Sequence, residues 1–199
     1  MVGQVRNLRN IIVSEFVSLD GVVEDPGGSE KSKHGGWTWG YWNDEIGKFK
    51  LDEIFATGAL LLGRVTYQGF AAAWPSMKDG QGFADRMNNL PKHVVSKTLE
   101  KLDWNNSRQI KGNIAEEVSK LKQQPGQDIL IFGSSELVRE LIQHDLIDEY
   151  RLLVYPVVLG SGKHLFGDES NKTLKLVETK PFSSGVVLLR YQRAENARK

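Results

Sequence analysis

The stretch LLLGRVTY, residues 60–67, decides the fold class of this 199-residue chain. The apolar run ALLLG, residues 59–63, predicts a short strand that is buried on both faces. RVTYQGFAAAW, residues 64–74, predicts a helix that begins directly after it. A buried strand that leads straight into a helix is the repeating unit of an α/β fold with a parallel sheet.

Strand and helix patterns alternate through the rest of the chain. Further strands are predicted at 10–17, 92–96, 128–133 and 150–160, and further helices at about 43–57, 113–124 and 134–145. The first of these helices is expected to bury Ile46, Phe49, Ile54 and Phe55. The tail, 172–193, holds two β-rich runs around a Pro and Ser-Gly turn, which predicts an antiparallel hairpin. We therefore expect one α/β domain over residues 1–199, with a mostly parallel sheet and a C-terminal hairpin.

Composition excludes several classes of function. The net charge is +1, so no global field attracts nucleic acid or an anionic membrane. Cysteine is absent, which excludes disulfides, thiol catalysis and thiolate metal sites. The N-terminus shows only a short apolar run, and neither a signal peptide nor a membrane span is predicted. We expect a cytoplasmic protein that binds neither nucleic acid nor membrane.

The strand end at Gly63 offers the chemistry of an anion site. Ligands of open α/β sheets bind outside the carboxyl ends of the strands, and a helix start provides free N–H groups there. Arg64 adds a planar cation and Thr66 a hydroxyl. The alternative is that Gly63 only makes a tight turn and that Arg64 is a solvated charge.

Two other strand ends carry small, hydroxylated or basic residues. They are Ser96, Lys97 and Thr98 after one strand, and Gly133, Ser134 and Ser135 after another. Ordinary turn and cap chemistry accounts for each alone. Three such ends together favour an extended phosphorylated ligand.

Other motifs are weaker. LGSGKH, residues 159–164, fails as a phosphate loop, because Val157 stands where the first Gly belongs and His164 follows the lysine. No two histidines have metal-ligand spacing, so no metal is predicted. Asp20, in SLDG after the first strand, makes a good turn and is also a candidate substrate contact.

The ordered motifs SLDG, LLLGRVTY, VVSKTL, FGSSELV and LIDEYRLLVYPVVLGSGKHLF resemble the dihydrofolate reductase superfold. The chain is most similar to the reductase domain of riboflavin-biosynthesis deaminase-reductases and to their stand-alone homologues. The resemblance covers nearly the whole chain and implies the three-layer dihydrofolate reductase-like fold.

This resemblance implies NADPH as the cofactor. Gly63, Arg64 and Thr66 would hold the adenosine phosphates or pyrophosphate, and Ser96, Lys97 and Thr98 would surround the adenine and its 2′-phosphate. Gly133, Ser134 and Ser135 would lie near the pyrophosphate and the nicotinamide ribose. Dihydrofolate reductases have a Gly-Gly pair with a cis peptide there, so the peptide between Gly133 and Ser134 is an open question.

The implied reaction is hydride transfer to a small heterocycle, of the pteridine or the 5-amino-6-(5-phosphoribosylamino)uracil type. Asp44 and Glu45 fall near the carboxylate that helps to protonate a pterin, and Asp20 is the second catalytic candidate. The alternative is an NADP-binding sensor or partner module with little turnover. Relatives of this kind are often dimers, and the tail hairpin and the 150–159 strand are candidate homodimer surfaces.

The aromatic stretch GGWTWGYW, residues 35–42, lies where the resemblance places the substrate side of the active site. We expect one or two of Trp37, Trp39 and Trp42 to form a flat wall beside the nicotinamide. Core packing is the alternative for these rings. A phosphate on the substrate would need further cations, for which Lys31, Lys33 and Lys163 are candidates.

Overall fold

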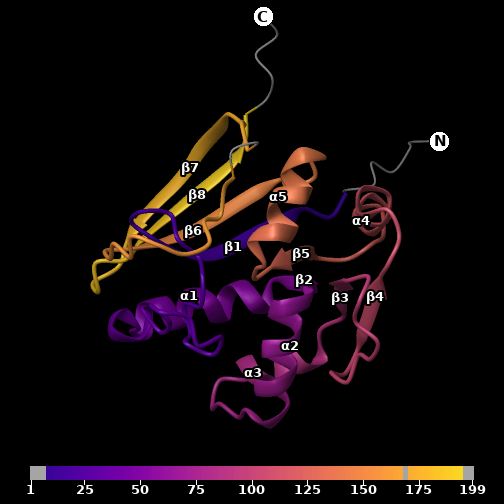
Figure 1. The fold of residues 1–199 in the computed structure, drawn as a ribbon, viewed down its shortest axis with the longest axis horizontal. Helices are drawn as coiled ribbons and strands as arrows, with labels where there is room; N and C mark the ends of the chain where they lie inside the picture. The colour runs from indigo at the N-terminus through magenta and orange to yellow at the C-terminus, as the bar shows by residue number, and fades with distance from the viewer. Residues whose placement is uncertain (1–7, 168–169, 195–199) are drawn as a thin grey trace, which may run out of the picture.

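The computed structural model describes residues 8–167 and 170–194, which form eight strands in one sheet (Figure 1). The order across the sheet is β4-β3-β2-β5-β1-β6-β8-β7. In chain order, the strands are β1 Ile11–Ser18, β2 Thr57–Gly63, β3 Lys92–Val95, β4 Ser107–Ile110, β5 Asp128–Ile131, β6 Glu149–Tyr155, β7 Leu174–Pro181 and β8 Val187–Arg193. Strands β1 to β6 pair in parallel, whereas β8 runs antiparallel to β6 and to β7. The mostly parallel sheet and the C-terminal hairpin are therefore confirmed.

Five α-helices cover the sheet in two layers. They are α1 Asp44–Phe55, α2 Arg64–Ala73, α3 Phe83–Asn89, α4 Ile114–Lys122 and α5 Ser135–Gln143. Figure 1 shows α1, α2 and α3 on one face and α4 and α5 on the other. The buried apolar residues divide accordingly: one cluster joins the sheet to α4 and α5, and two others join it to α1, α2 and α3. The three-layer fold class is confirmed.

The sequence patterns missed two short elements and misplaced some ends. Strand β4 and helix α3 were not predicted. Strand β6 ends at Tyr155 because Pro156 has no N–H to donate to the ladder. Phe55, expected on the buried side of α1, is instead 49% exposed, since it is the last residue of the helix and its ring lies over the loop at Gly82.

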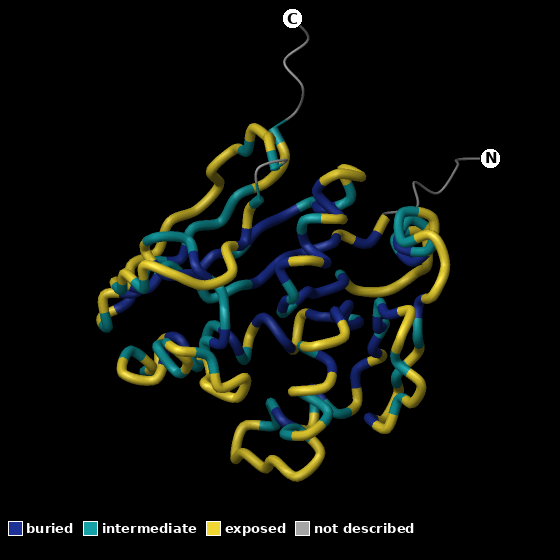
Figure 2. The backbone as a smooth tube through the Cα atoms, viewed as in Figure 1, coloured by how far each residue is buried: buried dark blue, intermediate teal, exposed yellow. Residues whose placement is uncertain are grey.

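Burial is highest in the middle of the sheet. Figure 2 shows β1, β2 and β5 as buried along most of their length, whereas β7 is exposed at the sheet edge. Among the described residues, no helix has both the length and the apolar composition needed to cross a membrane.

Candidate active site

Three neighbouring strands end in one row. Val13 of β1 pairs with Ile131 of β5, and Leu60 of β2 pairs with Leu130. Counting on from these pairs, Glu15, Gly133 and Gly63 fall side by side, beyond the last ladder position of β5. Strand β1 continues to Ser18, so β1 and β5 separate at this level. The carboxyl edge of the sheet opens here.

Glycine is required on both sides of this opening. A Cβ on Gly63 would lie 3.2 Å from the Cβ of Ser134, closer than side chains normally approach. Gly133 has a φ of +82°, and a Cβ there would lie 3.1 Å from Oγ1 of Thr66. The peptide between Gly133 and Ser134 is cis, which answers the question left open by the sequence.

Two helices begin at these glycines and offer free donors. Helix α2 follows Gly63, and α5 follows Ser134, and neither of these N-cap residues caps its helix with a side chain. The first N–H groups of both helices have no intrahelical partner, and the helix dipole adds partial positive charge. The two starts together can bind the oxygens of a phosphate group.

A cavity of about 1170 Å³ opens in front of this row, and we call it the main cavity. Its lining comes from β1, the loop between β1 and α1, the helices α1, α2 and α3, the α2–α3 connection, the link from β5 to α5, the start of α5 and Lys163. Thr66, Gly133, Ser134 and Ser135 line it, as do Asp44 and Glu15.

Aromatic rings form much of the wall of the main cavity. They are Phe16, Trp39, Trp42, Phe70, Trp74, Phe83 and Phe132. Trp39 and Trp42 are 66% and 47% exposed, so their rings are accessible from the cavity and from solvent. The Trp39 indole N–H donates to the carbonyl of Gly27 at 3.1 Å, which fixes the ring against the loop.

Glu15 is the unusual acid of the site. It lies in β1 between Ser14 and Phe16, and its Oε1 is buried without a hydrogen-bond partner among the described residues. Burial raises the pKa of this carboxyl to about 8, although Lys50 and the N–H of Gly133 favour the charged form. Glu15 therefore holds its proton at neutral pH and can donate it.

Lys50 of α1 lies near Glu15 and interacts with its charge. Its ammonium donates to Oγ of Ser14 at 2.8 Å and to Oε2 of Glu53 at 2.5 Å, and lies 4.2 Å from the centre of the Phe132 ring. Burial lowers the pKa of Lys50, and the charge of Glu53 opposes that change. Glu53 in turn pairs with Arg151 of β6 at 3.2 Å. The cation is thus fixed by partners and is not free to bind a ligand anion.

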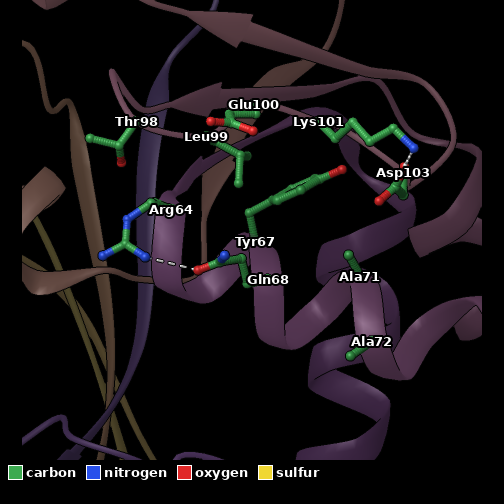
Figure 3. A pocket seen from close by; sticks show the side chains of 10 residues that line it. All are labelled: Arg64, Tyr67, Gln68, Ala71, Ala72, Thr98, Leu99, Glu100, Lys101 and Asp103. Atoms are coloured by element: carbon green, nitrogen blue, oxygen red, sulfur yellow. Dashed lines mark hydrogen bonds and ion pairs between the residues drawn. The ribbon is translucent and has the colours of Figure 1, made fainter.

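A second, smaller cavity of about 580 Å³ lies beside α2, and we call it the side cavity. Figure 3 shows Arg64, Gln68 and Tyr67 of α2 facing Thr98 and Leu99. The guanidinium of Arg64 donates to Oε1 of Gln68 at 2.9 Å, which orients it at the mouth.

The segment after β3 is shaped by Ser96. Its hydroxyl accepts from the N–H groups of Thr98 and Leu99 at 3.2 and 3.0 Å, so the chain turns toward α2. Thr98 lines the side cavity, whereas Ser96 and Lys97 do not.

Asp20 is placed differently from the expectation. It lines neither cavity, and its carboxylate accepts from the Ser18 hydroxyl at 2.6 Å and from the N–H groups of Leu159 and Gly160 at 3.1 and 2.7 Å. These bonds, the one from Ser18 first, lower the pKa of Asp20 to about 2. Asp20 thus holds two loops together, and its role as a substrate contact stays a prediction.

The other predicted residues divide between cavity and core. Asp44 lines the main cavity at the start of α1, whereas Glu45 accepts from the N–H of Ser183 at 2.8 Å. Trp37 does not line the cavity: its indole N–H donates to the carbonyl of Glu24 at 2.9 Å, and its ring packs edge-on against Tyr155. Core packing is therefore the role of Trp37, while Trp39 and Trp42 remain candidates for the substrate wall.

The sequence reading missed Glu15 and Lys50. One signal could have found Glu15, because a lone carboxylate within the apolar strand IIVSEFVS must find a partner or hold its proton. Lys50 gave no comparable signal, since a lysine in a helix is ordinary. Within the described ranges, no group of three or more acidic, histidine or cysteine side chains could hold a metal ion.

Comparisons with known proteins identify the family and the fold. Residues 9–188 match the model of the RibD C-terminal domain family. The chain is 35% identical to the uncharacterized protein YyaP of Bacillus subtilis over 187 residues, which cover 92% of this chain and 94% of YyaP.

Solved structures with the same fold include two of different description. A putative riboflavin biosynthesis protein from Shewanella sp. PV-4 has a TM-score of 0.73 at 21% identity, covering 94% of this chain and 99% of that one. Dihydrofolate reductase from Enterococcus faecalis, complexed with NADP(H), has a TM-score of 0.59 at 15% identity, covering 94% and 97%. These likenesses show the dihydrofolate reductase-like fold.

Proposed function

The chain belongs to the RibD C-terminal domain family, and from this premise we propose that it is an NADPH-dependent reductase of a small heterocycle. One observation carries the proposal. The ends of β2 and β5 meet at two uncapped helix starts, at the edge of a large cavity with aromatic walls. This arrangement suits a ligand that combines phosphates with a planar ring.

The residues fit NADPH along two connected regions. Gly63, Thr66, Gly133, Ser134 and Ser135 would hold the pyrophosphate and the nicotinamide ribose, because they provide backbone N–H groups at two helix starts and three hydroxyl groups. Glycine at both strand ends lets Ser134 and Thr66 pack closely against the backbone there, where a Cβ would collide with them. NADPH supplies the hydride when it is bound, and the protein supplies orientation and electrostatics.

The side cavity fits the other end of the cofactor. Arg64 and Thr98 line it, and Ser96 and Lys97 are adjacent in the chain. A 2′-phosphate on the adenosine ribose favours such cations, which is the reason for proposing NADPH instead of NADH. One charge-assisted bond from Arg64 is worth about 1.5–3 kcal/mol.

Glu15 is the residue that we assign to proton transfer. Reduction of a ring C=N bond needs a hydride at carbon and a proton at nitrogen, and Glu15 is a neutral carboxylic acid that lines the main cavity beside Gly133. It replaces Asp20 in this role. Asp44, exposed at the start of α1, would act by orienting the ring.

Titration with the two nucleotides tests the cofactor. Tryptophan fluorescence should saturate with NADPH at lower concentrations than with NADH. Arg64→Ala should weaken NADPH binding by about 10- to 100-fold, the equivalent of one charge-assisted bond, and leave NADH binding nearly unchanged. Arg108→Ala on the exposed strand β4 is the matched control, because Arg108 lines neither cavity. Absence of binding by either nucleotide would refute the proposal.

Turnover separates the reductase from the sensor. NADPH absorbance is followed with a dihydropteridine, with the phosphoribosylamino pyrimidine and with small quinones or aldehydes. Binding without oxidation across this panel would favour an NADP-binding sensor or partner module with the same fold.

A homodimer through the β7–β8 hairpin stays a prediction. Leu176 and Val177 of the edge strand β7 are 48% and 39% exposed, and paired copies would cover them. Sedimentation equilibrium measures the state directly. A Leu176→Lys variant should then shift the protein toward the monomer, whereas a wild-type monomer would contradict the prediction.

A further inference from the structure

We infer that the substrate of the main cavity is a planar ring that is neutral or cationic and carries neither phosphate nor carboxylate. The inference rests on the proposed function and narrows it to one of its two heterocycle types. It excludes the phosphoribosylamino pyrimidine and favours a simple ring of the pteridine kind. Three features of the lining support it separately. They are the excess of carboxylates, the carboxylate neighbours of the cations and the aromatic rings.

The first support is the excess of acid in the lining. The carboxylates are Glu15, Glu24, Asp25, Glu30, Asp44, Asp79 and Glu136, and the ammonium groups are Lys48, Lys50, Lys78 and Lys163. Leaving Glu15 aside, six carboxyl groups and four ammonium groups line the cavity. No arginine or histidine is present among the described lining residues. Arginine is the residue best suited to bind a phosphate or carboxylate in two-point geometry.

The second support is that three of the four cations already have carboxylate neighbours. Lys50 is held by Ser14 and Glu53 in the floor of the cavity. Lys48 bridges to Asp52 at 2.8 Å. An anionic substrate would have to compete with these carboxylates for Lys48 and Lys50, whereas Lys78 has no carboxylate partner among the described residues.

Lys163 also lies near a carboxylate, that of Glu30. Burial and the nearby charge of Asp25 raise the pKa of Glu30, and Lys163 opposes that effect. Like charges thus repel one another on the loop between β1 and α1, even with this lysine beside them. Lys31 and Lys33, named from the sequence as further phosphate candidates, do not line the cavity.

The third support is the aromatic surface of the cavity wall. Trp42 packs edge-on toward Phe16 with ring centres 6.3 Å apart, and a Cβ on Gly47 would lie 3.8 Å from the Trp42 indole nitrogen. Gly47 therefore leaves one face of that indole uncovered by a side chain. Aromatic faces are electron-rich and attract a neutral or cationic ring. They offer no electrostatic attraction to an anionic group.

The phosphates of NADPH do not contradict this charge pattern. They belong at the starts of α2 and α5 and at Arg64, where backbone donors and a guanidinium are available. Four of the carboxylates lie instead between residues 24 and 44, on the loop and at the start of α1. Bound cofactor would increase the negative potential in the remaining space and so strengthen the discrimination.

A matched series of flavins tests the inference without a known substrate. Lumichrome, riboflavin and FMN share one planar ring system and differ by a ribityl chain and then by a phosphate. Each is titrated into the full-length protein with saturating NADP⁺, which occupies the nucleotide region and cannot deliver hydride. Flavin fluorescence reports binding. We expect lumichrome and riboflavin to bind at least tenfold more tightly than FMN at low salt.

High salt and charge-removing substitutions distinguish electrostatic repulsion of the FMN phosphate from a steric limit on ligand size. At about 0.5 M NaCl the screening length falls to a few ångströms. The difference in affinity between riboflavin and FMN should therefore become smaller. The double variant Glu24→Gln, Glu30→Gln should narrow it as well, whereas Glu116→Gln, on the exposed face of α4, should not.

Two results would overturn the inference. FMN binding as tightly as riboflavin would show that the cavity accepts a phosphate, and binding of none of the three flavins while NADP⁺ binds would remove the planar ring class. Either result leaves the cofactor proposal intact. Failure of NADP⁺ itself to bind would instead refute the proposed function, and the two failures are therefore distinguishable.

Discussion

Replacing Glu15 by glutamine should make the folded protein more stable, by an amount that grows with pH. Glutamine keeps the shape of the side chain and removes the ionisable group. In the folded protein the carboxyl is buried and its Oε1 has no hydrogen-bond partner among the described residues. Ionisation there is costly, whereas in the unfolded chain it is not.

The size of the effect follows from the two pKa values. Burial raises the pKa of Glu15 from 4.5 to about 8, so the folded protein holds this proton more tightly than the unfolded chain does. Stability of the wild type therefore falls as pH rises from 4.5 to 8 and levels off above that window. At ~1.4 kcal/mol per tenfold change in proton affinity, the cost is about 1 kcal/mol at pH 5, about 3 kcal/mol at pH 7 and about 5 kcal/mol at pH 9.

Urea unfolding at these three pH values measures the effect directly. Tryptophan fluorescence follows the transition, and the difference in free energy between Glu15→Gln and wild type should rise by several kcal/mol from pH 5 to pH 9. Other titrating groups cancel in that difference, and Glu116→Gln serves as the exposed control, expected to stay within about 0.5 kcal/mol of wild type.

The same variant separates stability from catalysis. It should bind NADPH as the wild type does and lose turnover, whereas wild-type turnover should decline above pH 8 as Glu15 ionises. A stability difference that does not change with pH, or a variant less stable than wild type at pH 9, would refute the assignment of a neutral Glu15.

Three further substitutions test other parts of the site and fold. Gly63→Ala should destabilise the protein by about 1–3 kcal/mol and weaken NADPH binding, because the new Cβ crowds Ser134; urea unfolding and fluorescence titration measure both, and a neutral result would show that the strand end can relax. Trp39→Leu should leave stability nearly unchanged and weaken riboflavin binding about two- to tenfold, with unchanged binding excluding the ring as a wall. Lys92→Met should lower the free energy of unfolding by about 2 kcal/mol or more, since three backbone carbonyls lose their donor and the Trp104 ring loses a cation at 4.2 Å. A melting temperature equal to wild type would contradict this.

Local pattern was enough to find the strand ends, but it could not find their neighbours. The pairing of a buried strand with the next helix is a short-range feature, and Gly63 and Gly133 were both located by it. Their proximity depends on the strand order β2-β5-β1, which is set by long-range pairings such as Leu60 with Leu130 and Ile11 with Ile129. For the same reason, the sequence of a single segment could not predict that Glu15 lies beside Gly133.

Asp20 and Glu15 differ in how much the local sequence could show about their partners. Asp20 stood at a strand end with a Gly after it, and that position resembled a substrate contact. Its partners at Leu159 and Gly160 are about 140 residues away, and they take up both carboxylate oxygens. Glu15 was inside a strand, where a charge usually indicates an outward-facing side chain. Only the folded structure shows that its Oε1 is buried without a hydrogen-bond partner among the described residues and that its pKa is raised.

The aromatic segment at residues 35–42 serves both the core and the cavity. Trp37 and Tyr41 pack edge-on against the buried Tyr155, with ring centres 5.3 and 5.9 Å away. Trp39 and Trp42, two and five residues after Trp37, lie on the cavity wall. Anchoring alternate rings in the core fixes the backbone between them, so the exposed rings keep their positions without being buried themselves. A loop with this composition can therefore present a rigid flat wall to a substrate, and replacing its core rings would disturb ring binding at a distance from the cavity.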